Sequence, residues 1–144
     1  MKIEQIVSEW KKDSKIDNTD LANEALKLPG LHAKYLEIYT NENMILKKMF
    51  YDYKSFEKIK TMYYQGILPE EDRIELGWEV NNNKILKDDM KMYLAADKDM
   101  QSALLKIDLQ KQKVENLESI IESINRMGFA IKNAIDFIKF CGGN

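Results

Sequence analysis

The sequence predicts an all-α protein in which two long helices are accompanied by short N-terminal helices and a C-terminal helical oligomerisation segment. Only six glycines and two prolines occur in 144 residues, which is too few turn-forming residues for the many turns of an all-β fold. Apolar residues recur at helical spacing over long stretches instead. A chain of this length fits one domain with one core, so we treat 1–144 as a single helical domain.

Two short helices are expected at the N-terminus. The first covers residues 3–13, where the apolar residues at helical spacing are Ile3, Ile6, Val7 and Trp10. A polar, turn-like stretch follows, and Asn18 or Thr19 can cap a second short helix over 20–27. Pro29 and Gly30 are then expected to interrupt the chain.

The first long helix is predicted over residues 31–64, which contain no proline or glycine. Gly66 and Pro69 end it. Residues 65–83 are predicted to be a loop with a helical turn near 70–76. A shorter helix fits residues 84–94.

The last helical pattern runs over residues 99–140, with Asp97 or Asp99 as its N-cap. Gly128 indicates either a break, with a separate helix over 129–140, or a close approach of another helix. The tail 141–144 is expected to fray.

The first long helix has two different faces. At about 100° per residue its apolar face, predicted to be core, contains Ile45, Leu46, Met49, Tyr53, Phe56, Ile59 and Tyr63. The opposite side carries a row of Lys47, Tyr51, Lys54 and Lys58. Such a row can follow a phosphate backbone and stack a base. The alternative is an ordinary solvated helix face.

Lys60 does not belong to that row, because it projects into the apolar face. A buried ammonium is costly, so Lys60 must extend its amine to water, pair with an acid or line a wet groove. A charged residue on an otherwise apolar helix face departs from the usual pattern, and such departures often indicate a functional site.

The C-terminal pattern over 99–140, counted in heptads from Met100, places apolar residues at most a and d positions. Isoleucine at both positions favours oligomers larger than dimers. The candidate oligomerisation residues are Ile107, Val114, Leu117, Ile121, Ile124, Gly128, Ile131, Ile135 and Ile138. The alternative is that this stripe packs on the chain's own long helix.

Several function classes are unsupported by the sequence. The chain has one cysteine and one histidine and no glycine-rich phosphate loop or serine-nucleophile motif. We therefore expect no enzyme activity, no catalytic or metal-binding residues and no cofactor. No apolar run reaches the roughly 18 residues of a membrane helix, and no secretory signal is visible, so an intracellular, non-secreted protein without membrane contact is expected.

The cations consist of 20 lysines and two arginines in a chain of net charge −2. Lysine attracts phosphate as a point charge and reads base edges less well than the planar fork of arginine. Any nucleic-acid binding is therefore expected to be non-specific contact with the backbone.

Four segments, in order, resemble the UvsY-like recombination mediators of T-even-type phages. They are Trp10–Thr19 with Leu21 and Glu24–Ala25, Lys58–Lys60 with Tyr63–Gly66, Leu94–Asp99, and Arg126–Lys132. Residues 67–83 depart from the family pattern, so nothing is transferred there. The resemblance spans nearly the whole chain.

The resemblance implies a protein of the infected host cell's cytoplasm that assembles, through its C-terminal region, into a ring of about six or seven subunits. It implies binding to single-stranded DNA and loading of a phage RecA-like recombinase of the UvsX type onto strands covered by the phage single-strand DNA-binding protein. The family's basic DNA-binding pair matches Lys58 and Lys60, the second of which is lysine here rather than arginine.

Two functions follow as hypotheses. In the first, residues 1–98 bind single-stranded DNA and 99–140 assemble the ring, with DNA contacts from Lys58, Lys60, Lys54, Lys47, Tyr51, Tyr63 and Tyr64. In a ring, one weak site per chain gains affinity through effective concentration. In the second, the chain is a helical structural or assembly oligomer without DNA affinity.

Overall fold

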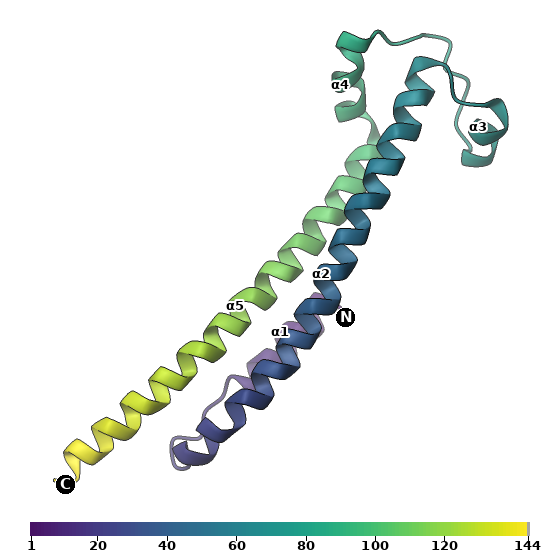
Figure 1. The fold of residues 1–144 in the computed structure, drawn as a ribbon. Helices are drawn as coiled ribbons and strands as arrows, with labels where there is room; N and C mark the ends of the chain where they lie inside the picture. Colours follow the sequence, from purple (N-terminus) through teal and green to yellow (C-terminus); the bar gives the residue numbers. More distant parts are fainter. Residues whose placement is uncertain (144) are drawn as a thin grey trace. The chain divides into compact units, whose positions relative to one another are not determined.

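Residues 1–143 are described by a computed structural model, and within them all regular structure is α-helical (Figure 1). The helices are α1 (Ile3–Asp13), α2 (Leu21–Gln65), α3 (Glu70–Leu76), α4 (Lys87–Ala96) and α5 (Lys98–Cys141). The all-α prediction with two long helices is therefore confirmed. Of the predicted tail 141–144, Cys141 still belongs to α5, and Asn144 lies outside the described residues.

The predicted interruption at Pro29 and Gly30 is wrong, because α2 runs through both residues. A proline inside a helix removes one hydrogen bond and costs about 3 kcal/mol or more. Leu28 and Leu31, on either side, both pack against a buried core. Their burial offsets the cost, so the two helices predicted over 20–27 and 31–64 form one.

The predicted break at Gly128 is also wrong, and α5 continues through it. The other prediction for Gly128, a close approach of another helix, is confirmed. A Cβ at Gly128 would lie 3.7 Å from Cδ1 of Leu28, which belongs to α2. That is an ordinary van der Waals distance. Gly128 therefore marks where α2 packs on α5, and the space there would accept a methyl group.

The chain divides into two compact units, one of residues 1–44 with 111–143 and the other of residues 45–110. Both long helices contribute to both units. This division differs from the predicted parts 1–98 and 99–140, whose separate functions stay predictions.

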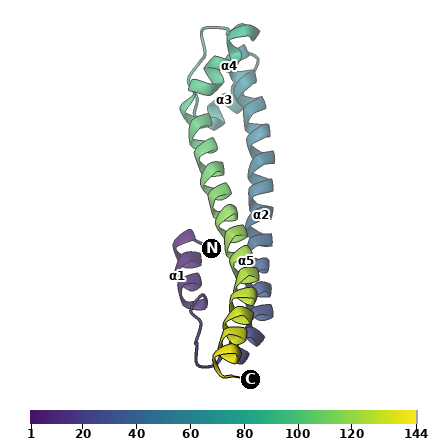
Figure 2. The ribbon, with the colours of Figure 1, turned by 90° about the vertical axis from the view of Figure 1, so that its left-hand side faces the viewer.

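In the first unit, α1 packs on the first half of α2 and the second half of α5 (Figures 1 and 2). Its core consists of Ile6, Tyr35, Leu117, Ile120 and Ile124. Trp10 stacks edge-on against Tyr35, with ring centroids 5.5 Å apart. The Tyr35 hydroxyl is buried and donates a hydrogen bond to Asp13 at 2.9 Å, which satisfies the polar end of this core residue.

In the second unit, the end of α2 packs with α4, the start of α5 and residues 67–83. Gly66 ends α2 with a φ of +74°, and its N–H donates to the Tyr63 carbonyl while that of Ile67 donates to Met62. This Schellman-type ending needs the left-handed conformation that glycine adopts at low cost. Gly77 ends α3 in the same way.

The predicted core face of α2 is only partly confirmed in this second unit. Leu46, Met49, Tyr53, Phe56, Ile59 and Tyr63 are half-buried, but Ile45 is 47% exposed. The most buried apolar residues here are instead Met90, Met100 and Ile107, on α4 and α5. The helical period of the apolar residues therefore predicted which side of α2 faces the rest of the chain, but not how deeply the residues on that side are buried.

Candidate nucleic-acid interface

Three lysines on the second unit's part of α2 form an exposed cationic row. Lys47, Lys54 and Lys58 are all exposed, and among residues 1–143 none of them pairs with an acid. Tyr51 lies between them along the helix and is 73% exposed. We call these four residues the lysine row. It presents three free ammonium groups and one accessible aromatic ring to solvent.

Neighbouring side chains shape one end of the lysine row into an open hollow. Lys54 and Lys58 line it together with Glu57, Thr61, Met62 and Gln65. Lys48, by contrast, lies beside the row and is paired with Asp52 at 3.6 Å, a distance typical of an exposed helical pair. Unpaired ammonium groups in a shallow groove are the arrangement that non-specific phosphate contact requires.

Lys60 occupies a different environment, because only 4% of it is exposed. Its Nζ lies 3.1 Å from Asp97 and 3.0 Å from Asp99, and 4.0 Å from the ring centroid of Trp78. The sequence left three possibilities for the Lys60 ammonium: water, an acid or a wet groove. The structure shows the ion pair with acids, together with a cation–π contact to Trp78. Because its ammonium is buried, Lys60 is not exposed to a DNA strand that lies along the lysine row. Its role as a DNA contact stays a prediction.

Tyr63 and Tyr64 are half-buried and belong to the same cluster as Lys60. The Tyr63 hydroxyl donates to the Glu79 carbonyl at 2.7 Å, and that of Tyr64 donates to Asp97. Their rings pack on Trp78 and Tyr93, with centroids 5.2 and 6.0 Å apart. These contacts engage both tyrosines within the chain, and their part in DNA binding stays a prediction.

Asp97 is the residue on which this cluster converges. Its Oδ1 accepts a hydrogen bond from the backbone N–H of Met100 at 2.9 Å, which confirms Asp97 as the N-cap of α5. Burial by itself would raise the pKa of Asp97, but hydrogen bonds from Tyr64, Met100 and Lys60 outweigh it and hold the pKa below its usual value. Burial and the bond to Asp97 raise the pKa of Tyr64, so this hydroxyl remains a donor.

The segment 67–83 supplies functional neighbours that the sequence did not reveal. Trp78 covers the Lys60 ammonium, and Asn81 donates to the carbonyls of Tyr63 and Tyr64 at 3.2 and 3.1 Å. The only sequence signal was a lone tryptophan in a polar loop beside Gly77. Recognising its partner requires the three-dimensional structure.

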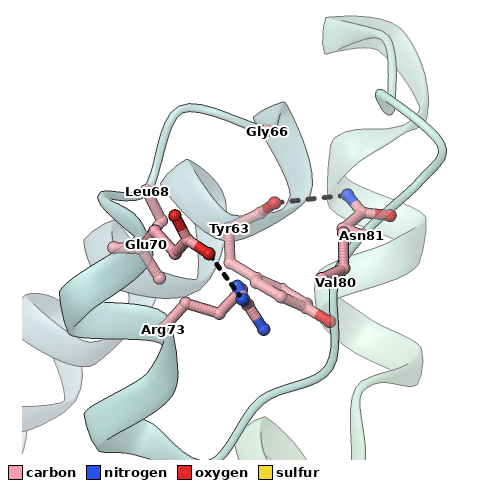
Figure 3. A pocket seen from close by; sticks show the side chains of 7 residues that line it. All are labelled: Tyr63, Gly66, Leu68, Glu70, Arg73, Val80 and Asn81. Carbon is pink, nitrogen blue, oxygen red and sulfur yellow. Dashed lines mark hydrogen bonds and ion pairs between the residues drawn. The ribbon is translucent and has the colours of Figure 1, made fainter.

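A small cavity of about 230 Å³ lies where this segment folds back on the end of α2. Figure 3 shows its lining, which is Tyr63, Gly66, Leu68, Glu70, Arg73, Val80 and Asn81. The guanidinium of Arg73 donates to the Trp78 carbonyl at 2.9 Å and lies 3.7 Å from Glu70. Together with the hydrogen bonds from Asn81 to the end of α2, these contacts hold the segment in place around the cavity.

The candidate oligomerisation residues divide by burial. Ile107, Val114, Leu117, Ile124 and Ile131 are buried within the chain, as the alternative of packing on α2 predicts. Ile121, Gly128 and Ile135 are half-buried, and Ile138 is exposed. The end of α5 also exposes three phenylalanines, of which Phe140 is 81% exposed; the other two are Phe129 and Phe137. These three rings near the end of one helix offer apolar surface that a protein partner can cover.

Residues 1–143 lack two further features. They contain no group of three or more histidine, cysteine or carboxylate side chains placed to hold a metal ion. Among these same residues, no helix has the length and apolarity to cross a membrane.

Comparisons with known proteins give one consistent result. A family model described as "Recombination, repair and ssDNA binding protein UvsY" matches residues 9–144. Recombination protein uvsY of Enterobacteria phage T4 is 30% identical over 147 residues, covering 99% of each chain.

Crystal structures of the bacteriophage T4 recombination mediator protein UvsY superpose on this fold with TM-scores of 0.85. One is 26% identical and covers 97% of this chain and 99% of its own. Another is 27% identical and covers 99% and 98%.

Proposed function

This chain belongs to the UvsY family of recombination, repair and single-stranded DNA-binding proteins, and we propose that its lysine row contacts the DNA. As a member of that family it is a recombination mediator. The observation that supports the proposed contact is the row itself, three exposed and unpaired ammonium groups beside an exposed Tyr51. Lysine's point charge favours phosphates over base edges, so binding is non-specific in sequence.

The proposed division of labour separates Lys58 from Lys60. Lys58 contacts phosphate together with Lys54 and Lys47, while Tyr51 stacks a base. Lys60, with Asp97 and Trp78, holds the end of α2 on the start of α5. Tyr63 and Tyr64 belong to this support. The family's basic pair is thus proposed to contribute one contact residue and one positioning residue in this chain.

Assembly is proposed to occur through the exposed remainder of α5. The buried isoleucines are occupied within the chain, which leaves Ile138 and the exposed phenylalanines Phe129, Phe137 and Phe140 for a neighbouring subunit. A ring of about six or seven subunits would align one lysine row per chain. Weak contacts then multiply through effective concentration, which explains how an acidic chain binds DNA.

The proposed mediator action is binding alone, with no nucleotide consumed and no enzymatic step. In the cytoplasm of the infected host cell, the assembly holds a strand covered by the phage single-strand DNA-binding protein. It stabilises the first complex between that strand and a UvsX-type recombinase. A nucleotide-hydrolysis assay on the protein alone tests the non-enzymatic part, and turnover would contradict it.

Fluorescence anisotropy with a labelled oligo-dT strand tests the DNA site. We expect log affinity to fall by roughly 0.7 per unit of log salt for each phosphate engaged. Lys54→Ala/Lys58→Ala should weaken binding, while Lys87→Ala/Lys91→Ala, which removes two exposed lysines of α4, should change it little. No binding at low salt by oligomeric protein would favour a structural assembly without DNA affinity.

A further inference from the structure

The outer face of α3 is acidic and unpartnered. Glu71, Asp72 and Glu75 are exposed, and none of them forms an ion pair among residues 1–143. Arg73 is the sole cation between residues 67 and 83, and its guanidinium is turned inward to the Trp78 carbonyl. Ile74, which lies beside these acids, is 62% exposed. The same unit thus carries an acidic, partly apolar helix face and an unpaired cationic row.

The two surfaces do not meet within one chain. Residues 67–83 are held on α2 through Tyr63, whose ring packs on Trp78 and whose hydroxyl binds the Glu79 carbonyl. At about 100° per residue, Tyr63 lies roughly 140–180° around α2 from Lys54 and Lys58. The segment is therefore anchored on the side of α2 away from the lysine row, and no ion pair joins the two.

We propose that the lysine row also receives α3 of a second copy of this chain, so that acidic α3 and DNA compete for it. This inference rests on the proposed DNA site. The occupant follows from charge complementarity, because the chain itself offers three unpaired carboxylates on α3 to match three unpaired ammonium groups. Ile74 beside those acids and Tyr51 within the row add an apolar contact.

The contact between α3 and the lysine row is expected to be weak enough for DNA to displace it. Exposed ion pairs are individually weak and are screened by salt. Between subunits of one oligomer they gain from a high effective concentration. A polyphosphate strand, which offers more charges at closer spacing, displaces α3. Each row is therefore closed to weak anionic ligands until a strand binds.

Zero-length carbodiimide coupling tests the contact directly, since it joins a carboxylate to an amine only when the two touch. Oligomers formed from isotopically light and heavy protein allow peptides cross-linked between chains to be recognised by mass. We expect mixed-isotope peptides joining residues 70–79 to Lys54 or Lys58, and we expect oligo-dT to suppress them. Cross-links confined to one chain, or their absence, would overturn the proposal.

A charge-matched pair of variants provides the second test. Glu71→Gln/Asp72→Asn/Glu75→Gln should bind oligo-dT about three- to tenfold more tightly at low salt, with the gain shrinking as salt rises. Glu37→Gln/Asp108→Asn/Asp136→Asn removes the same charge from exposed, unpaired carboxylates elsewhere. An equal gain in both variants would mean long-range repulsion only, and would overturn the contact.

The two proposals fail in different ways. Wild-type protein that binds oligo-dT but gives no cross-link between chains retains the DNA site and loses the α3 contact. Protein that gives these cross-links without binding oligo-dT retains the contact between subunits and loses the DNA site, and with it the competition.

Discussion

The ammonium of Lys60 lies 4.0 Å from the ring centroid of Trp78, a residue eighteen positions further along the chain. This contact joins the last turns of α2 to a segment with no regular structure of its own at that point. Asp97 and Asp99 complete the surroundings of the ammonium. The cluster fixes where α2 ends relative to α5, while Lys58, two residues earlier, stays in solvent.

Lys60→Ala and Lys58→Ala should therefore differ in kind. Removing the Lys60 ammonium leaves buried Asp97 without its cation, and we expect a loss of about 3 kcal/mol in the free energy of unfolding. Lys58→Ala should change it by less than about 0.5 kcal/mol but weaken DNA binding. Urea unfolding and oligo-dT anisotropy measure the two effects, and equal stability of the two variants would contradict this assignment.

Stability should fall in acid through Asp97. Its pKa in the folded protein is held below the ordinary 3.8, so its contribution is present above that value and is lost as pH falls through the folded pKa. Thermal unfolding from neutral pH to about pH 3 should show a decline that is smaller in Asp97→Asn. Asp108→Asn, at an exposed and unpaired carboxylate, should retain the wild-type profile.

Two glycine substitutions should act in opposite directions. Gly30 lies inside α2 with nothing within 4 Å of a Cβ placed there, so Gly30→Ala should stabilise the protein by about 0.5–1 kcal/mol. Gly77 has equal space but a φ of +74°, and Gly77→Ala should destabilise it by about 1 kcal/mol. Calorimetry measures both, and a shared sign would contradict the backbone explanation.

The end of α5 should control assembly without controlling the fold. Phe137→Ser/Phe140→Ser changes two exposed rings, so we expect a smaller particle by light scattering and an unchanged helical content. Ile131→Ser, at a buried position, should instead lower the unfolding free energy by about 2–4 kcal/mol. An oligomer unaffected by the phenylalanine changes would place the interface elsewhere.

The sequence determined that the chain is helical and which side of each long helix is apolar, because the spacing of apolar residues is a local property. It located the end of α2 at Gly66, a helical turn near 70–76, and the solvent side of α2 with its lysines, and it narrowed the N-cap of α5 to Asp97 or Asp99. The motif order also identified the family. Each of these depends on residues a few positions apart.

The tertiary structure decided which local signals were overridden and which side chains meet. Pro29 and Gly128 lie inside continuous helices because Leu28 packs on α5 at that level, and such packing is not encoded in either helix alone. Lys60 is buried because Asp97 and Trp78 arrive from distant parts of the chain. A lysine's charge can be known from sequence, but whether water or a carboxylate solvates it depends on long-range contacts.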